Sequence, residues 1–255
     1  MFGLPVNASA HGYEIDALII YMHAFMIVLS VGWGLFFVFV LLRFNCRVNP
    51  KADYAGFKSQ ANSYVELAVV VIEVIFLVGF SIPFWAKQVN AFPDRPDAIE
   101  VRIVAEQFAW NVHYPGKDGV FGRTNPKLVD QQTNPIGLDL SDPNAQDDIT
   151  AINQLHMPVG RPLIIHLSSK DVIHCFTLPE MRVKQDVIPG MSIKTWFTPT
   201  KTGAWEITCA QLCGIGHYRM KGFYTVHSEA EYDQWLAQQP TAGGSSNSGG
   251  DSFWN

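Results

Sequence analysis

The sequence predicts a membrane-anchored α+β protein, in which an N-terminal two-helix transmembrane hairpin precedes a β-sandwich or barrel. Two long apolar runs fall within the first 90 residues. Beyond about residue 90, short apolar stretches alternate with turn residues. A dense group of Cys, His and Met lies between two of the last apolar stretches. We therefore expect four regions, at 1–16, 17–89, 90–228 and 229–255.

The two apolar runs cover about 17–42 and about 65–85. A helix needs roughly 20 apolar residues to cross a bilayer, so each run is long enough. The first run is too long and too uniformly apolar for a buried helix of a soluble protein. It also exceeds the apolar core of a cleavable signal peptide, which is about 7–15 residues long, and no basic segment precedes it.

The segment between the two runs is basic. Because basic short loops stay in the cytoplasm, both ends of the chain are expected outside it, in the periplasm or an equivalent compartment. The basic side chains are Arg43, Arg47, Lys51 and Lys58. Residues 1–16 then form an extracytoplasmic N-terminal segment.

The sequence pattern of the region 90–228 predicts a β domain, because short apolar stretches with Pro and Gly turns are typical of a sandwich or barrel. The expected strands lie within 98–116, 162–169, 192–200, 203–209 and 222–228. A polar stretch at about 116–150 is expected to be a long insertion between strands. Ser228 and Glu231 form a capping box for a short helix, and a flexible Gly/Ser tail follows it.

The group of Cys, His and Met has metal-ligand chemistry. Residues 209–220, CAQLCGIGHYRM, offer Cys209, Cys213, His217 and Met220 on one loop between two expected strands. His174 ends the strand-like segment DVIH and is a further candidate ligand. The loop would lie at one end of the sandwich, outside the cytoplasm.

Several chemistries remain open for this loop. A disulfide between the two loop cysteines would close only a short loop, with little entropic benefit. Two Cys and two His suit tetrahedral zinc, which has little use for a methionine. Soft thiolate and thioether ligands together favour copper. A single-ion blue-copper site needs one cysteine, whereas two thiolates can bridge two copper ions, with the Gln211 carbonyl as a further ligand.

The chain resembles subunit II of the haem–copper cytochrome c oxidases over about residues 14–239. The resemblance is carried by residues 171–190, DVIHCFTLPEMRVKQDVIPG, and by residues 209–220, behind two transmembrane runs. It implies a cupredoxin-like Greek-key domain holding a binuclear copper centre (copper A). The implied copper ligands are His174, Cys209, the Gln211 carbonyl, Cys213, His217 and Met220.

The resemblance also implies a function and partners. The chain would be subunit II of an aa-type terminal oxidase, which takes electrons from cytochrome c, or from a c-type haem domain of a supercomplex. It would pass them to haem in subunit I, where O2 is reduced to water with proton translocation. Further partners would be other oxidase subunits and membrane lipid. The expected place is the bacterial inner membrane, with the copper domain in the periplasm, rather than the mitochondrial inner membrane.

The net charge of −5 gives no support for a nucleic-acid partner.

Three positions depart from the family pattern. Gln211 stands where many members have a glutamate that also binds magnesium, which weakens the case for magnesium at the subunit I interface. Phe108 stands where the family usually has a tryptophan, the entry point for electrons that the resemblance implies, and Trp110 takes the second aromatic place. The alternative is that both belong to the core of the sandwich. Lys170 and Asp171 stand where many members have two acids, so one steering charge is reversed, and we hypothesise a less basic donor or a haem domain held in a larger assembly.

Other polar residues receive separate interpretations. Glu66 resembles the family glutamate at the mouth of a proton channel into subunit I, and Glu73 is expected to pack against subunit I. Cys175 is expected to be a small buried thiol that points away from the metal, and Cys46 to be unreactive. Three rivals are a quinol-oxidase subunit II, which would lack the copper ligands, a membrane-tethered copper chaperone and a zinc-stabilised domain.

Overall fold

The computed structural model describes residues 3–51, 54–56, 58–94 and 97–244. The predicted Gly/Ser tail therefore lies largely outside the described residues. The chain forms two compact units: a helical unit, Tyr13–Ala91, and a β unit made of the residues up to Gly12 and those from Phe92 onward.

The helical unit contains two long apolar helices. The first, α1 (Gly12–Arg43), has 32 residues. The second runs from Ala61 to Asn90 as α2 (Ala61–Val74), a π-helical segment (Ile75–Ser81) and α3 (Ile82–Asn90). Both are long and apolar enough to cross a membrane, and the predicted runs lie inside them. Large apolar side chains along both helices are exposed, which suits a surface that meets lipid or other subunits.

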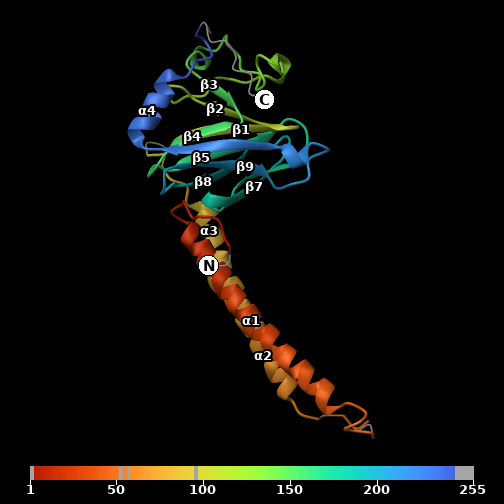
Figure 1. Cartoon of the computed structure of the whole chain (residues 1–255). Coiled ribbons are helices and arrows are strands. Elements are labelled where there is room, and N and C mark those ends of the chain that lie inside the picture. The colour runs from red at the N-terminus through yellow and green to blue at the C-terminus, as the bar shows by residue number, and fades with distance from the viewer. Residues whose placement is uncertain (1–2, 52–53, 57, 95–96, 245–255) are drawn as a thin grey trace. The chain divides into compact units, whose positions relative to one another are not determined.

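The β unit is a sandwich of two five-stranded sheets (Figure 1). One sheet has the strand order β3-β2-β1-β5-β8 and the other β4-β10-β9-β6-β7. The strands are β1 (Ile99–Glu106), β2 (Ala109–Tyr114), β3 (Ile149–Ile152), β4 (Gln154–Pro158), β5 (Leu163–Ser169), β6 (His174–Leu178), β7 (Val183–Val187), β8 (Ile193–Phe197), β9 (Gly203–Cys209) and β10 (Lys221–His227).

The core lies between the two sheets, because alternate side chains of each strand point to opposite faces. In β1 the residues that face inward are Val101, Ile103 and Ala105, each fully buried. Large aromatic side chains fill the space between the sheets, among them Trp110 and Phe176. A membrane-anchored sandwich of this kind confirms the predicted fold class.

Some strand predictions were wrong in detail. The stretch 98–116 is not one strand but a hairpin, with β1 and β2 joined at Gln107 and Phe108. No Gly or Pro marks this turn in the sequence. His174 begins β6 rather than ending a strand. The sequence reading also missed β3, β4 and β7, which are only four or five residues long; β7 in addition carries a polar exposed face.

The polar stretch predicted as an insertion connects β2 to β3. It contains a small apolar cluster of its own, formed by Ile136, Leu138 and Ala145. A buried hydrogen bond between His113 Nε2 and Asp148 Oδ2, at 2.7 Å, ties its end to β2. Internal packing and this anchor explain how a polar segment keeps a defined course over the sheet.

The chain ends in α4 (Glu229–Gln238), whose start has the predicted capping box. Ser228 Oγ accepts a hydrogen bond from the Glu231 backbone N–H. The Glu231 carboxylate accepts one from the Ser228 backbone N–H. The helix packs on β4 and β10 through Trp235, which stacks on His156 with a ring separation of 4.2 Å.

Candidate metal centre

The candidate metal loop, residues 209–220, connects two paired strands of the same sheet. Thr208 in β9 lies opposite Lys221 in β10, so both ends of the loop are fixed by the ladder. On the other side, Phe176 in β6 pairs with Cys209, and Ala210 N–H donates to the Cys175 carbonyl at 3.0 Å. This pairing brings the start of β6, and with it His174, beside the first loop cysteine.

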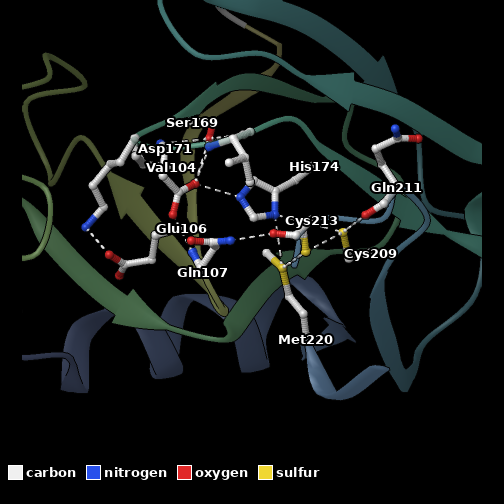
Figure 2. A network of polar contacts seen from close by, with 12 residues as sticks. Val104, Glu106, Gln107, Ser169, Asp171, His174, Cys209, Gln211, Cys213 and Met220 are labelled. Carbon is white, nitrogen blue, oxygen red and sulfur yellow. Dashed lines mark hydrogen bonds and ion pairs between the residues drawn. The ribbon is translucent and has the colours of Figure 1, made fainter. Parts of the chain in front are cut away.

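All six predicted ligands meet in one cluster. Figure 2 shows His174, Cys209, Gln211, Cys213 and Met220 of this cluster. The Sγ atoms of Cys209 and Cys213 lie 3.8 Å apart and are not bonded to each other. Cys213 Sγ is 3.6 Å from both His217 Nδ1 and Met220 Sδ. His174 Nδ1 lies 3.1 Å from Met220 Sδ and 4.0 Å from Cys209 Sγ.

The Gln211 carbonyl oxygen completes the cluster, 3.2 Å from Cys209 Sγ. Its side chain is exposed, and Figure 2 shows the amide pointing away from the sulfur atoms. The donor atoms of His174, Cys209 and Cys213 lie within 4.8 Å of one another. This His/Cys/Cys group could hold a metal ion.

Three residues of the cluster are buried, whereas Cys209 and His217 are half-buried, and exposed apolar side chains of the same loop surround them. His174 is fully buried, and Cys213 and Met220 are each 3% exposed. By contrast, Leu212, Ile215 and Tyr218 of the same loop are 77%, 98% and 86% exposed. The loop thus turns its sulfur and nitrogen ligands inward and its large apolar side chains outward.

The two cysteines have different acidities. Burial disfavours the Cys209 thiolate, but hydrogen bonds from His174 and from backbone groups outweigh it and lower the pKa of this thiol. Burial, together with the charge of Cys209, raises the pKa of Cys213. Two thiols side by side thus ionise one after the other, and a cation is the natural partner for both thiolates.

Asp171 contacts the ring of His174 from the side opposite the sulfur atoms. Its Oδ1 lies 2.9 Å from His174 Nε2, and its Oδ2 accepts the Gln107 backbone N–H at 2.7 Å. Burial opposes the His174 cation, but hydrogen bonds to Cys209 and Asp171 outweigh it and raise the pKa of this imidazole. Sequence reasoning treated Asp171 only as a surface charge and did not consider Gln107.

The two aromatic residues suggested for electron transfer lie in different environments. Phe108, half-buried in the turn between β1 and β2, packs against the loop glycines Gly214 and Gly216. Trp110 is fully buried, edge-on to His174 at 6.1 Å and to Phe176 at 5.4 Å. Of these two residues, Phe108 is therefore the one that is partly exposed beside the metal loop.

Lys170 does not present an isolated positive charge. Its Nζ lies 2.5 Å from Glu106 Oε2 and donates to the Pro135 carbonyl at 2.6 Å. The lysine thus neutralises a neighbouring acid and fastens the insertion to β1. The reversed charge at this position gives no support to a less basic electron donor.

The remaining predicted residues lie apart from the cluster. Cys175 is buried, with its Sγ 3.7 Å from Thr177 Oγ1. Cys46 is exposed near the end of α1. Glu66 and Glu73 are exposed on α2 in the helical unit.

A β-sandwich with a Cys, His and Met cluster on one loop, in a chain with two membrane-length helices, defines a membrane-anchored cupredoxin-like protein. Residues 99–225 match the family model described as "Cytochrome C oxidase subunit II, periplasmic domain". The chain is 35% identical to the alternative cytochrome c oxidase subunit 2 of Bradyrhizobium diazoefficiens, over 82% of this chain and 74% of that protein. It is 28% identical to cytochrome c oxidase subunit 2 of Synechocystis, over 94% and 76% of the two chains.

Among solved structures, the periplasmic domain of subunit II of cytochrome oxidase (CoxB) of Bradyrhizobium japonicum is 28% identical, with a TM-score of 0.40, over 55% of this chain and 91% of that one. The family match and the curated relatives show that this chain belongs to the cytochrome c oxidase subunit II family. It is thus a membrane-anchored subunit of a haem–copper oxidase complex in respiratory electron transport, which confirms the resemblance seen in the sequence.

Proposed function

We propose that this chain is the subunit at which electrons enter an aa-type terminal oxidase, through a binuclear copper centre held by residues 209–220 and His174. Electrons would come from a c-type cytochrome and pass to haem in subunit I, where O2 is reduced with proton translocation. The observation that carries the proposal is the single cluster of two thiols, two imidazoles, a thioether and a carbonyl oxygen.

The donor set fits copper better than zinc. Zinc sites use thiolates, imidazoles and carboxylates, and would leave the buried Met220 sulfur without a role. A thioether next to thiolates is a soft donor that selects copper. A blue-copper site for one ion uses a single cysteine, whereas Cys213 Sγ here faces Cys209, His217 and Met220 together.

The residues that would hold copper are His174, Cys209, the Gln211 carbonyl, Cys213, His217 and Met220. A bound copper pair would supply a carrier that takes up and gives away one electron at a time. The chain's own contribution is a fixed set of ligands. The loop ends are held by β9 and β10, and His174 by β6, so little ligand movement is expected when the charge of the site changes.

Phe108 is the residue we propose as the contact for the electron donor, since its ring lies against Gly214 and Gly216 of the metal loop. The buried Trp110 would serve as a packing contact for the ring of His174 inside the domain. The exposed side chains of Leu212, Ile215 and Tyr218 provide an apolar surface for a protein partner at the same loop. A c-type cytochrome and subunit I are the proposed partners.

The membrane placement is also part of the proposal. The metal domain would lie in the periplasm of a bacterium, with the two helices in lipid of the inner membrane against subunit I. Glu66 would stand at the mouth of a proton channel in that subunit. Magnesium is left out, because the exposed Gln211 amide is neutral and a weaker ligand than a carboxylate for a hard cation.

Copper loading of the metal-free full chain tests the proposal. We expect two copper ions per chain in the unmodified protein. Met220→Leu should weaken copper binding by about tenfold, a loss of about 1.4 kcal/mol, because it removes one weak soft ligand. Met157→Leu, at another buried methionine, is the matched control and should bind like the unmodified chain.

The same titration distinguishes the rivals. A zinc-stabilised domain would bind zinc in preference and ignore the Met220 substitution. A copper chaperone would take up one ion and transfer it to a competing chelator. A quinol-oxidase scaffold would take up none. Any of these three results would contradict the proposed electron-transfer role.

A further inference from the structure

A short turn far from the metal loop in the sequence makes two polar contacts with the site. This turn joins β1 to β2 and contains Gln107. The Gln107 side chain donates through Nε2 to the Cys213 carbonyl at 2.6 Å. Its backbone N–H donates to Asp171 Oδ2 at 2.7 Å. The turn thus connects the segment before β6 with the metal loop, and Figure 2 shows both contacts.

Asp171 is held in place by several further donors. Its Oδ1 accepts the Val172 N–H at 2.7 Å and the Ser169 hydroxyl at 3.3 Å, besides its contact with His174 Nε2 at 2.9 Å. A carboxylate surrounded in this way keeps a fixed orientation. Its oxygens have hydrogen-bond partners within the protein, next to the ring of His174.

This arrangement decides which nitrogen of His174 faces the metal site. An ionised carboxylate only accepts hydrogen bonds, so Nε2 carries a proton that points at Asp171. The lone pair of the neutral ring then lies on Nδ1, which faces Met220 Sδ and Cys209 Sγ. Carboxylates that hold the outer nitrogen of a ligating histidine fix the tautomer and raise the basicity of the ligand.

We propose that Asp171 and Gln107 are positioning residues of the metal centre, and we call the pair the bracket. Asp171 orients His174 so that its Nδ1 faces the other ligands. Gln107 holds the backbone of the loop at Cys213 close to Asp171 and His174. The proposal rests on the proposed copper function and extends it to two residues outside the ligand set. The bracket runs His174, Asp171, Gln107, Cys213, and so joins the two ligands that come from separate segments of the chain.

The experiment uses the full chain in detergent with three variants: Asp171→Asn, Gln107→Met and the double variant. Glu100→Gln is the matched control, because Glu100 forms another carboxylate–histidine pair, with His166 at 3.2 Å, on strands outside the metal cluster. Copper affinity is measured by competition with a chelator, and the reduction potential by titration.

Asp171→Asn and Gln107→Met should each weaken copper binding by about 10-fold to 100-fold, the usual effect of losing an outer partner of a ligand. The double variant should lose less than the product of the two effects, because both residues belong to one network. Asp171→Asn should also raise the reduction potential, since a less basic His174 stabilises the oxidised state less. Glu100→Gln should change neither quantity.

A measurement without copper separates this proposal from the function on which it rests. In the metal-free chain with ¹⁵N-labelled histidine, the His174 signals should show a protonated Nε2, and Asp171→Asn should give a mixture of tautomers. If the unmodified chain fails to bind two copper ions, the copper function is wrong, while these signals still decide the role of Asp171.

The proposal is overturned if Asp171→Asn leaves the His174 signals unchanged and binds copper as tightly as Glu100→Gln does. Should Asp171→Asn not fold, Gln107→Met decides, because it keeps the carboxylate and removes only the contact with the Cys213 carbonyl. Unchanged affinity in that variant would overturn the bracket, and a tenfold loss in a folded chain would support it.

Discussion

At the residue scale, the metal loop depends on two glycines as well as on its ligands. A Cβ atom at Gly216 would lie 2.5 Å from ring carbons of Phe108, and one at Gly214 would lie 2.6 Å from Gln107 Nε2. Gly214 also has a φ of +139°, which other residues rarely adopt. The two glycines therefore let the turn between β1 and β2 approach the metal loop.

Gly216→Ala should destabilise the β unit by about 1–3 kcal/mol, as expected for overpacking a close contact. The cause would be collision with the Phe108 ring, so the double variant Gly216→Ala with Phe108→Ala should recover part of the loss. Thermal unfolding of the metal-free chain measures both effects. If the double variant loses as much stability as the two single variants lose together, the Phe108 contact is not the reason for a glycine at this position.

The ligand residues could be predicted from the sequence because four of them lie within twelve positions. Metal-binding chemistry is readable from side-chain types at short spacing. Asp171 and Gln107 could not be assigned in this way, because their contacts depend on how separate strands pair. The buried position of Trp110 has the same origin, since only the hairpin register turns its side chain into the core.

At the element scale, α4 is attached to the sandwich by a stack of aromatic rings. His156 stacks on Trp235 with a ring separation of 4.2 Å, and its Nδ1 is 2.8 Å from His227 Nε2. Tyr114 and Tyr232 also pack against Trp235. Charged groups at this face are Glu231, which acts on His227, and Arg161, paired with Glu229 at 3.0 Å.

This stack makes folding stability dependent on pH. Burial, followed by repulsion from His227, lowers the pKa of His156 from 6.5 to about 4. Because the folded pKa is below the unfolded one, the contribution of His156 is complete above about pH 6.5. It is lost as pH falls towards 4, where the unfolded chain binds a proton that the folded chain resists.

His156→Phe keeps the ring stack and removes this titration. Between pH 7 and 4.5, the unfolding midpoint of the metal-free variant should fall less steeply than that of the unmodified chain, as followed by circular dichroism. Acidic side chains titrate in both proteins, so the difference in slope isolates the histidine. Parallel curves would mean that His156 does not couple α4 to pH.

The elements themselves were predictable to different degrees. Long apolar runs give membrane-length helices with little dependence on context, and the capping box of α4 is a local signal. Strands β3, β4 and β7 were missed because four or five residues carry too little periodicity. The turn at Gln107 was missed because it lacks Gly and Pro, and its conformation is stabilised by contacts with Asp171 and Cys213.

At the scale of the whole molecule, the chain combines two membrane-length helices with a sandwich whose metal loop projects an apolar rim. Membership of the subunit II family places this combination in a haem–copper oxidase complex. The sequence supports that assignment because the helices and both motifs follow the family order. It could not show that Lys170 is paired with Glu106, a contact that depends on strands β1 and β5 lying side by side.

In the proposed function, Cys209 and Cys213 on one loop would hold a copper pair over which one electron is shared. Electron paramagnetic resonance of the fully loaded, oxidised full chain tests it most directly. We expect a hyperfine pattern from one unpaired electron spread equally over two copper nuclei, with two coppers per chain. A pattern from a single copper nucleus, or a loaded chain without a paramagnetic signal, would show that the loop does not hold a binuclear copper centre.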